Sequence, residues 1–211
     1  MASSRGPRSS WSAGSPKYRD LQTMKIAVLV TLMLLSLATG SVHAQSGYGE
    51  PVPPYGGDDD VNSADSLWRT LAREQLVGTK VIHSTPYQGV YPHGAVLEML
   101  DAEVNVSGQR GPVIITRNYG GSGASKNNVA TNPERYLQSI TVMFKRERGY
   151  DPDNKDWFWV KYMPNGEIFK DAQGRALAGR VAKDSKTEGC IACHRTAPGA
   201  DYVFNYDRYA R

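Results

Sequence analysis

The residue types and spacing with the clearest chemistry lie near the C-terminus, where the chain reads Cys190-Ile191-Ala192-Cys193-His194. We call these five residues the pentad. Two thiols three residues apart on one turn of chain can add to the two vinyl groups of a single haem. The histidine that follows can then ligate the iron through a neutral imidazole nitrogen. The pentad therefore predicts one covalently bound haem c, attached through Cys190 and Cys193, with His194 as an axial iron ligand.

Three other interpretations of the two cysteines fit the chain less well. A Cys-x-x-Cys redox pair belongs to a strand–helix–strand setting, and no such pattern precedes the pentad. A zinc site needs two further ligands, and the mature chain offers only His83 and His93, without ligand-like spacing. A disulfide between Cys190 and Cys193 closes a very small loop and adds little stability. An exported domain with that disulfide and no haem is the non-haem alternative.

The N-terminal segment has the features of a secretory signal peptide. Lys25 follows Met24, an apolar run covers residues 26–37, and Ala44 supplies the small residue of a cleavage site. The run is too short to span a bilayer comfortably, so a retained anchor is the less favoured alternative. Translation can begin at Met24. We assign residues 1–44 to an N-terminal extension and signal peptide, and expect a periplasmic protein, because haem c is attached in that oxidising compartment.

Removal of the signal peptide changes the charge balance. The full chain has 25 Lys and Arg against 21 Asp and Glu. Five of the basic residues and one acidic residue precede the cleavage site, which leaves 20 of each in the mature chain. A neutral mature chain gives no support for binding nucleic acid or an acidic membrane surface.

The mature chain divides into a linker and one domain. Residues 45–62 are rich in Gly and Pro and end in three aspartates, which predicts a flexible, solvated linker. Residues 63–211 are long enough for one domain with its own core, to which we assign the haem. A helix is expected over residues 63–77, ended by Gly78. Its apolar stripe consists of Leu67, Trp68, Leu71, Ala72 and Leu76.

From there the chain is mostly β. Strands are expected over residues 112–119, 140–145, 157–162 and 167–169, separated by turns rich in Gly, Pro, Asn and Asp. Ala95–Val106 fits both the strand and the helix period. The expected fold class is α+β and β-rich, with an antiparallel meander sheet and a few helices. A four-helix-bundle cytochrome needs four long helical segments, and this chain offers one.

Motifs around the pentad resemble those of the cytochrome P-460 family. Gly189 precedes the pentad, and Asp201-Tyr202-Val203-Phe204 follows it. Upstream, the chain reads Asp156-Trp157-Phe158-Trp159-Val160-Lys161-Tyr162 and then Gly179-Arg180-Val181-Ala182. The resemblance covers roughly residues 83–207 and is strongest after Ser139.

The resemblance implies a β-rich domain, often dimeric, with one haem c, a proximal histidine and commonly an open sixth position on the iron. Family members of one kind oxidise hydroxylamine to nitrogen oxides, and their haem carries an extra bond to a lysine. Close relatives, the β-type cytochromes c-prime, lack that bond and bind small gases such as nitric oxide. The implied partners are a small nitrogenous or gaseous ligand, a periplasmic redox partner and a second copy in a homodimer. Whether the chain is a hydroxylamine-oxidising enzyme stays open.

One departure from the family concerns the strand that ends in Asn118-Tyr119. Family relatives often have a lysine where this chain has Thr116, and Arg117 follows it. If that lysine forms the link to the haem, the link cannot form here, and hydroxylamine oxidation is disfavoured. Arg117 cannot replace the lysine as a nucleophile, because a guanidinium stays protonated. Thr116 and Arg117 are the candidate pocket residues.

Two hypotheses remain for the distal side of the haem, opposite His194. An open site would take a small ligand, with Arg117 as a donor over the iron and a carboxylate as a proton acceptor. The carboxylates of the β-rich region, each more typical of a solvated surface, are Glu98, Asp101, Glu103 and Glu134. A plain electron-transfer cytochrome would instead have six-coordinate iron. Its candidate second ligands are Met99, Met143, Met163, His83 and His93.

Overall fold

The computed structural model of the chain describes residues 54–198 and 201–204. The predicted extension and signal peptide (1–44) and the first part of the predicted linker (45–53) lie outside the described residues. The export signal therefore stays a prediction. Among the described residues, none of the helices has the length and apolar character needed to cross a membrane.

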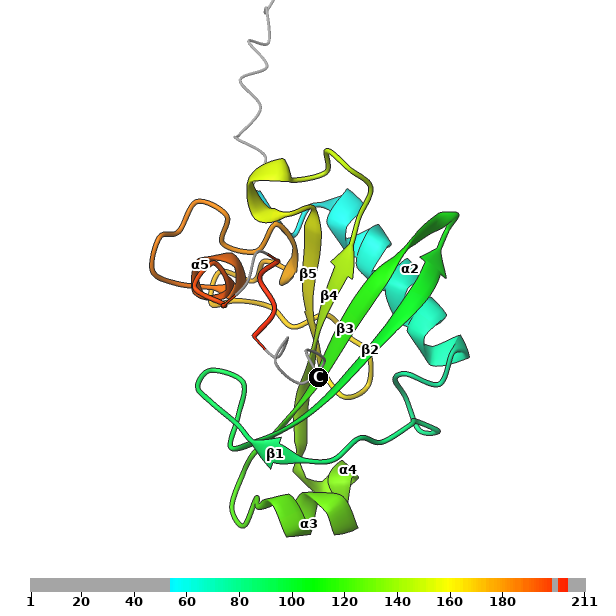
Figure 1. Cartoon of the computed structure of the whole chain (residues 1–211), viewed down its shortest axis with the longest axis vertical. Coiled ribbons are helices and arrows are strands. Elements are labelled where there is room, and N and C mark those ends of the chain that lie inside the picture. The colour runs from blue at the N-terminus through cyan, green and yellow to red at the C-terminus, as the bar shows by residue number, and fades with distance from the viewer. Residues whose placement is uncertain (1–53, 199–200, 205–211) are drawn as a thin grey trace, which may run out of the picture. The chain divides into compact units, whose positions relative to one another are not determined.

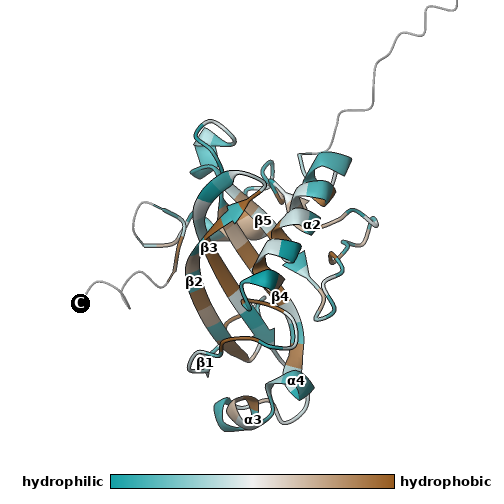
Figure 2. Cartoon of the chain, turned by 90° about the vertical axis from the view of Figure 1, so that its right-hand side faces the viewer, coloured by the Kyte–Doolittle hydropathy of each residue, from teal (hydrophilic) through white to brown (hydrophobic). Residues whose placement is uncertain are grey.

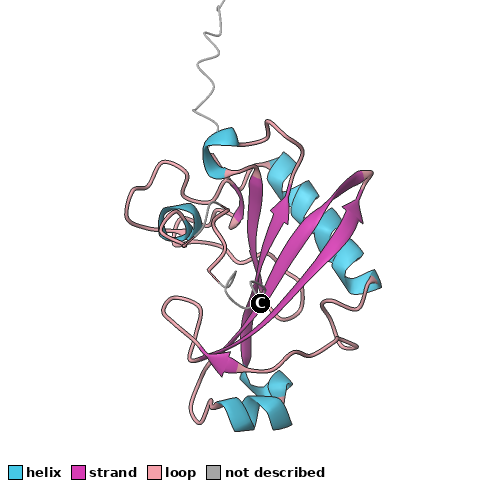
Figure 3. Ribbon diagram, viewed as in Figure 1, coloured by secondary structure: helices cyan, strands magenta, loops and turns pink. Residues whose placement is uncertain are grey.

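A six-stranded antiparallel sheet forms the centre of the described domain (Figure 1 and Figure 3). Its strands are neighbours in chain order, without a crossover. The sequence prediction of a β-rich α+β fold with an antiparallel meander is confirmed. The strands are β1 (Tyr87–Gln88), β2 (Val96–Val106), β3 (Gln109–Tyr119), β4 (Leu137–Lys145), β5 (Trp157–Tyr162) and β6 (Ala178–Gly179).

The hairpin of β2 and β3 is the longest pairing in the sheet. Each strand has 11 residues, and the pairing runs from Val96 opposite Tyr119 to Val106 opposite Gln109. The two residues between the strands, Ser107 and Gly108, have φ angles of 52° and 93°. A two-residue turn needs positive φ at both positions to match the twist of the strands. Residues 95–106, which fit both the strand and the helix period in the sequence, therefore form the strand β2 from Val96 onward.

The other expected strands have two outcomes. Those at 112–119, 140–145 and 157–162 are present as parts of β3, β4 and β5. The one at 167–169 was wrong as a strand, because this segment forms only an isolated bridge between Ile168 and Tyr162. After the turn at Gly166 the chain leaves β5 within a few residues, so a continuous ladder does not develop.

The main helix, α2 (Asp58–Arg73), has different ends from those predicted. Its first turn contains Asp58, Asp59 and Asp60, which the predicted linker includes. Three carboxylates there interact favourably with the positive end of the helix dipole. The helix ends at Arg73 because Gln75 adopts a left-handed conformation with φ of 59°. The apolar stripe is confirmed in part: Leu67 and Leu71 are buried and Trp68 is half-buried, but Ala72 is exposed, and the buried Leu76 lies beyond the end of the helix.

The sheet separates two hydrophobic clusters. On the side that we call the helix face, Leu67 and Leu71 of α2 pack in one cluster with Val113, Ile115 and Val142, and Figure 2 shows α2 in front of the hydrophobic strands. On the opposite side, the pentad face, Ile191 lies in a cluster with sheet residues Met143, Trp157 and Trp159. Successive side chains of a strand point to opposite faces, so β3, β4 and β5 each contribute to both clusters. The remaining helices are α3 (Lys126–Thr131), α4 (Pro133–Tyr136), the 3-10 turn η1 (Pro152–Asn154) and α5 (Cys190–His194).

Candidate functional site

The pentad forms the short helix α5, and Gly189 allows it to lie close to the preceding loop. Gly189 has a φ of 90°, which L side chains rarely adopt. A Cβ at this position would lie 2.2 Å from the Cβ of Ala182. The glycine is therefore required by both the backbone conformation and the close approach of the two segments.

The two cysteines of α5 are free thiols on one helical turn. Cys190 is partly buried and Cys193 is exposed. Burial raises the pKa of the Cys190 thiol to about 11, although Lys161 opposes the shift. The pentad predicts two thiols for haem attachment on one turn. The structure has both, with Cys190 protonated and partly buried and Cys193 exposed beside it. The cysteine disulfide of the non-haem alternative is not formed between them.

His194 is held in one tautomer by the tail that follows α5. Its Nδ1 lies 2.8 Å from the carbonyl oxygen of Tyr202. A carbonyl only accepts, so Nδ1 carries the proton and Nε2 keeps its lone pair. Burial lowers the pKa of His194 to about 4, which keeps the ring neutral. A neutral imidazole with one nitrogen anchored by a hydrogen bond is the usual state of a histidine that ligates a metal.

Three contacts hold the tail at Tyr202 and at Asp201, the residue before it. Lys145 Nζ of β4 lies 2.5 Å from Asp201 Oδ1, and Trp157 Nε1 of β5 donates to the Asp201 carbonyl at 3.0 Å. The Tyr202 hydroxyl donates to the carbonyl of Asp153 at 3.2 Å. The Asp-Tyr-Val-Phe motif thus positions the Tyr202 carbonyl against the His194 ring.

Aromatic rings surround His194. The ring centroids of Trp159 and Phe204 lie 4.8 and 5.2 Å from that of His194. Trp159 Nε1 is buried and has no hydrogen-bond partner among the described residues. A buried N–H group without an acceptor is costly, and it is explained if a bound group supplies the acceptor. A haem carries carboxylates that can accept such a bond, so the donor set beside α5 fits this cofactor.

The two candidate pocket residues lie on opposite faces of the sheet. Thr116 pairs with Met99 and Thr141 and shares the pentad face with Ile114. Arg117 points to the helix face, where it is 3% exposed and donates to the carbonyls of Leu76 and Ile82. This placement does not support a role for Arg117 as a donor over the iron, whereas the pocket role of Thr116 stays a prediction.

Glu98 belongs to the same buried network as Arg117. Its carboxylate is 1% exposed and accepts hydrogen bonds from Arg117 Nη1 at 3.2 Å and from the Tyr119 hydroxyl at 2.5 Å. Burial and the Glu98 charge raise the pKa of Tyr119. His83 Nδ1 lies 3.1 Å from each Glu98 oxygen. Glu98 therefore serves the helix face and is not placed as a proton acceptor beside α5. The other candidate carboxylates, Asp101, Glu103 and Glu134, are exposed.

His93, one of the candidate second ligands, contacts His194. The two ring centroids are 6.1 Å apart. Met143 is buried on the pentad face, Met99 is buried in β2, and Met163 is exposed. His83 contacts Glu98, which pairs with Arg117 on the helix face. Sequence reasoning gave no reason to prefer His93, because it precedes His194 by a hundred residues and sits in a turn-like segment.

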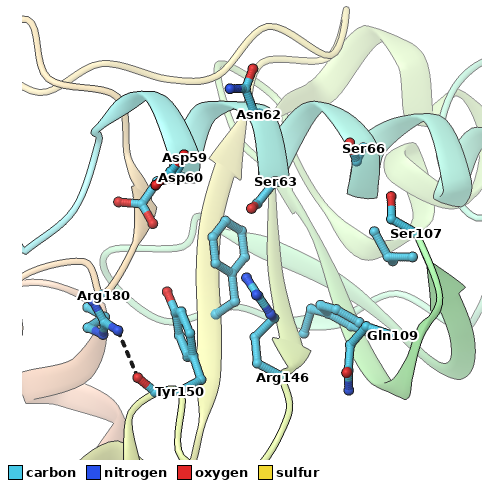
Figure 4. Close-up of a pocket in the computed structure, with 13 residues that line it drawn as sticks. Asp59, Asp60, Asn62, Ser63, Ser66, Ser107, Gln109, Arg146, Tyr150 and Arg180 are labelled. Carbon is cyan, nitrogen blue, oxygen red and sulfur yellow. Dashed lines mark hydrogen bonds between the residues drawn. The ribbon is translucent and has the colours of Figure 1, made fainter.

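A separate hollow of about 610 Å³ lies between α2 and the sheet, near the start of the helix (Figure 4). Asp59, Asp60, Arg146, Tyr150 and Arg180 are among its lining residues. Arg180 donates to the Tyr150 carbonyl at 2.8 Å, and the guanidinium groups of Arg146 and Arg180 each lie over the Tyr150 ring. No residue of the pentad lines this hollow, so it is distinct from the site at α5.

The family model for Cytochrome P460 matches residues 61–205, which include the sheet and the pentad. No curated protein and no solved structure matches the chain.

Replacement of Arg117 by Met tests the assignment of the Glu98 network to the helix face. We expect a loss of about 3–5 kcal/mol of unfolding free energy, because a buried carboxylate loses its charged partner. The absorption spectrum of the folded haem protein should not change. Urea unfolding and absorption spectroscopy measure the two effects.

Arg110→Met is the matched control. Arg110 forms an exposed pair with Glu103 in the same hairpin, with side chains 73% and 53% exposed, so its loss should cost less than about 1 kcal/mol. Equal stability losses in the two variants, or an altered haem spectrum in Arg117→Met alone, would contradict the assignment.

Proposed function

The chain belongs to the cytochrome P460 family and is a haem-binding cytochrome; we propose that it is an exported one, with a single haem c bound through Cys190 and Cys193 and ligated at the iron by His194. When bound, the haem supplies an iron that changes oxidation state and can bind small ligands. The chain supplies the attachment, the proximal ligand and the surroundings of that iron.

The observation that carries this proposal is the state of His194. The ring is neutral, its Nδ1–H donates to Tyr202, and its Nε2 keeps a lone pair. It lies on the same short helix as two free thiols. A hydrogen bond at the far nitrogen orients a ligating imidazole and increases its basicity. These are the features that a proximal haem ligand needs.

The buried ring of Trp159 would exclude water from one side of His194 and bind the edge of the cofactor, and the exposed Phe204 would cover part of another side. Trp159 and Phe204 flank the His194 ring. A haem carboxylate near Trp159 Nε1 would satisfy the unpaired N–H group. A dry environment strengthens that hydrogen bond and favours the neutral imidazole.

The distal side supports binding or redox turnover of a small nitrogen oxide or gas better than hydroxylamine oxidation. Thr116 stands on the pentad face where many relatives have a lysine, and a threonine cannot form the amine link to the haem. Glu98 and Arg117, which would supply a proton acceptor and a cation, bond to each other on the helix face. Proton removal from hydroxylamine needs a base within hydrogen-bond reach of the substrate, and these residues do not provide one.

Electron transfer is the second candidate function, and His93 is the observation that favours it. An imidazole 6.1 Å from the His194 ring centroid is a candidate for the sixth position, which electron-transfer haems commonly fill. In either case a redox partner in the periplasm would exchange electrons with the haem. The homodimer known among relatives is part of the proposal.

Loss of both thiols should abolish covalent attachment. In Cys190→Ala/Cys193→Ala, the haem should be fully extracted by acid-acetone, whereas the wild-type chain should retain it on a denaturing gel. Each single variant keeps at most one thioether bond and should retain less haem. The control is Thr196→Val, an exposed residue two positions after the pentad, which should retain all the haem. Haem that remains covalently bound to the double variant would show that Cys190 and Cys193 are not the attachment residues.

The mass of the mature protein tests export. The holoprotein purified from the periplasmic fraction should have the mass of residues 45–211 plus one haem, as measured by intact mass spectrometry. A membrane-bound product that keeps residues 24–44 would instead show that the apolar run is a retained anchor.

A further inference from the structure

His93 and His194 form a pair of imidazoles on the pentad face. Their ring centroids are 6.1 Å apart, and the ring planes are inclined by 77°. His93 lies in the loop between β1 and β2. In Figure 1 this loop extends to the same side of the long strands as α5. The two residues reach this position from segments a hundred residues apart, so the sheet and the tail bring them together.

The hydrogen bonds around Asn118 set the tautomer of His93. Asn118 Nδ2 donates to Ser139 Oγ at 3.2 Å and to Thr141 Oγ1 at 3.3 Å. The amide oxygen of Asn118 therefore faces His93, whose Nδ1 lies 3.1 Å from it. An amide oxygen only accepts, so Nδ1 of His93 carries the proton. Thr141 Oγ1, 3.4 Å from the same Nδ1, is a second neighbour on this side of the ring.

The imidazole rings of His93 and His194 thus have the same tautomer. In each, Nδ1–H donates to a fixed oxygen and Nε2 keeps its lone pair. No hydrogen bond of either Nε2 atom occurs among residues 54–198 and 201–204. Two imidazoles, each anchored through a protonated Nδ1 with Nε2 left available, have the form of two metal ligands.

The loop that carries His93 is held firmly to β3. The Ala95 amide donates to the Tyr119 carbonyl at 3.0 Å, and the His93 amide donates to the Val90 carbonyl at 2.9 Å. Gly94 has a φ of 134°, and a Cβ there would lie 2.6 Å from the Tyr119 carbonyl oxygen. Only glycine allows this approach. His93 is therefore positioned by backbone contacts as well as by Asn118.

The distance between the rings agrees with a shared metal. A metal–imidazole bond is about 2 Å long, and each ring centre lies about 1 Å beyond its nitrogen, so two imidazoles on opposite sides of one metal have centres about 6 Å apart. We propose that His93 is the second axial ligand of the haem iron, opposite His194, with Asn118 and Thr141 as its positioning residues. This inference rests on the proposed haem c at the pentad.

Ligation by His93 has a consequence for small ligands. With His93 and His194 both bound, the iron would be six-coordinate and low-spin, and a gas or nitrogen oxide would have to displace the His93 imidazole. If His93 is bound in nine of ten molecules, the apparent affinity for an external ligand falls about tenfold. The site then favours electron transfer at rest and admits a ligand through displacement of His93.

The experiment uses the full-length holoprotein, matured with a haem-attachment system, and its His93→Ala variant. Wild type should be low-spin in the ferric and ferrous states by absorption and electron paramagnetic resonance. His93→Ala should be high-spin, and its ferrous form should bind carbon monoxide about tenfold more tightly. Added imidazole should restore the low-spin spectrum of the variant.

His83→Ala is the matched control, because His83 is an imidazole that contacts Glu98 on the helix face. It should leave both the spin state and the carbon monoxide affinity unchanged. Asn118→Ala should shift the wild-type spectrum partly to high-spin, since it removes the oxygen that orients His93. This variant keeps the ligand itself.

Two kinds of failure are distinguishable. A wild-type protein with covalent haem that is high-spin, and that binds carbon monoxide as tightly as His93→Ala, overturns the role of His93 while the proposed function stands. A high-spin wild type whose affinity for carbon monoxide changes in His93→Ala would show that His93 is a distal hydrogen-bonding group and not a ligand. That result also overturns the proposed ligation and leaves the proposed function standing. A protein without covalent haem overturns the proposed function itself.

Discussion

The hydrogen bond from His194 Nδ1 to the Tyr202 carbonyl connects the fold to the chemistry of the site. One partner lies on the pentad helix, and the other lies in a tail that β4 and β5 hold through Lys145 and Trp157. The bond fixes which nitrogen of His194 is available and how its ring is oriented. If the tail were displaced, the ring could rotate and either nitrogen could carry the proton. The sheet, the tail and α5 are therefore one positioning unit.

The alternation of side chains along β3 divides the structure's polar groups between its two faces. Arg117 points to the helix face and pairs with Glu98, while Thr116 and Asn118 point to the pentad face. Arg117 and Glu98 thus form a network that is satisfied on the helix face. On the pentad face, aromatic rings and neutral hydrogen-bonding groups lie around His194 and His93, and Lys145 is paired with Asp201 of the tail. Burial among such groups favours neutral imidazoles.

The sequence predicted those parts of the fold and site that depend on local patterns. The pentad, the β-rich meander and three of the expected strands follow from spacing and period, and the family was recognisable from short motifs. The start of α2 was missed because its three aspartates were interpreted as solvated linker, although carboxylates also stabilise a first helical turn. The short segment at Ile168 has strand-like residues, but strand formation depends on a neighbour that only the tertiary structure supplies.

Contacts between distant segments were beyond sequence reasoning. Nothing local marks the Tyr202 carbonyl as an acceptor, because it is a backbone atom. The pairing of His93 with His194 depends on the register of β2 and β3 and on the close approach of Gly94 to Tyr119. Arg117 and Glu98 were considered as site residues because charge was visible but strand orientation was not. Each case required the fold before the chemistry could be assigned.

The central claim is that the pentad face holds two neutral imidazoles that ligate one haem iron. Pulsed electron paramagnetic resonance of the ferric holoprotein, grown with ¹⁵N-labelled histidine, counts the histidine nitrogens bound to the iron. Ligation by His93 and His194 should give hyperfine couplings from two axial imidazoles. Coupling to a single imidazole would contradict the claim for His93, and the absence of histidine coupling would contradict the site as a whole.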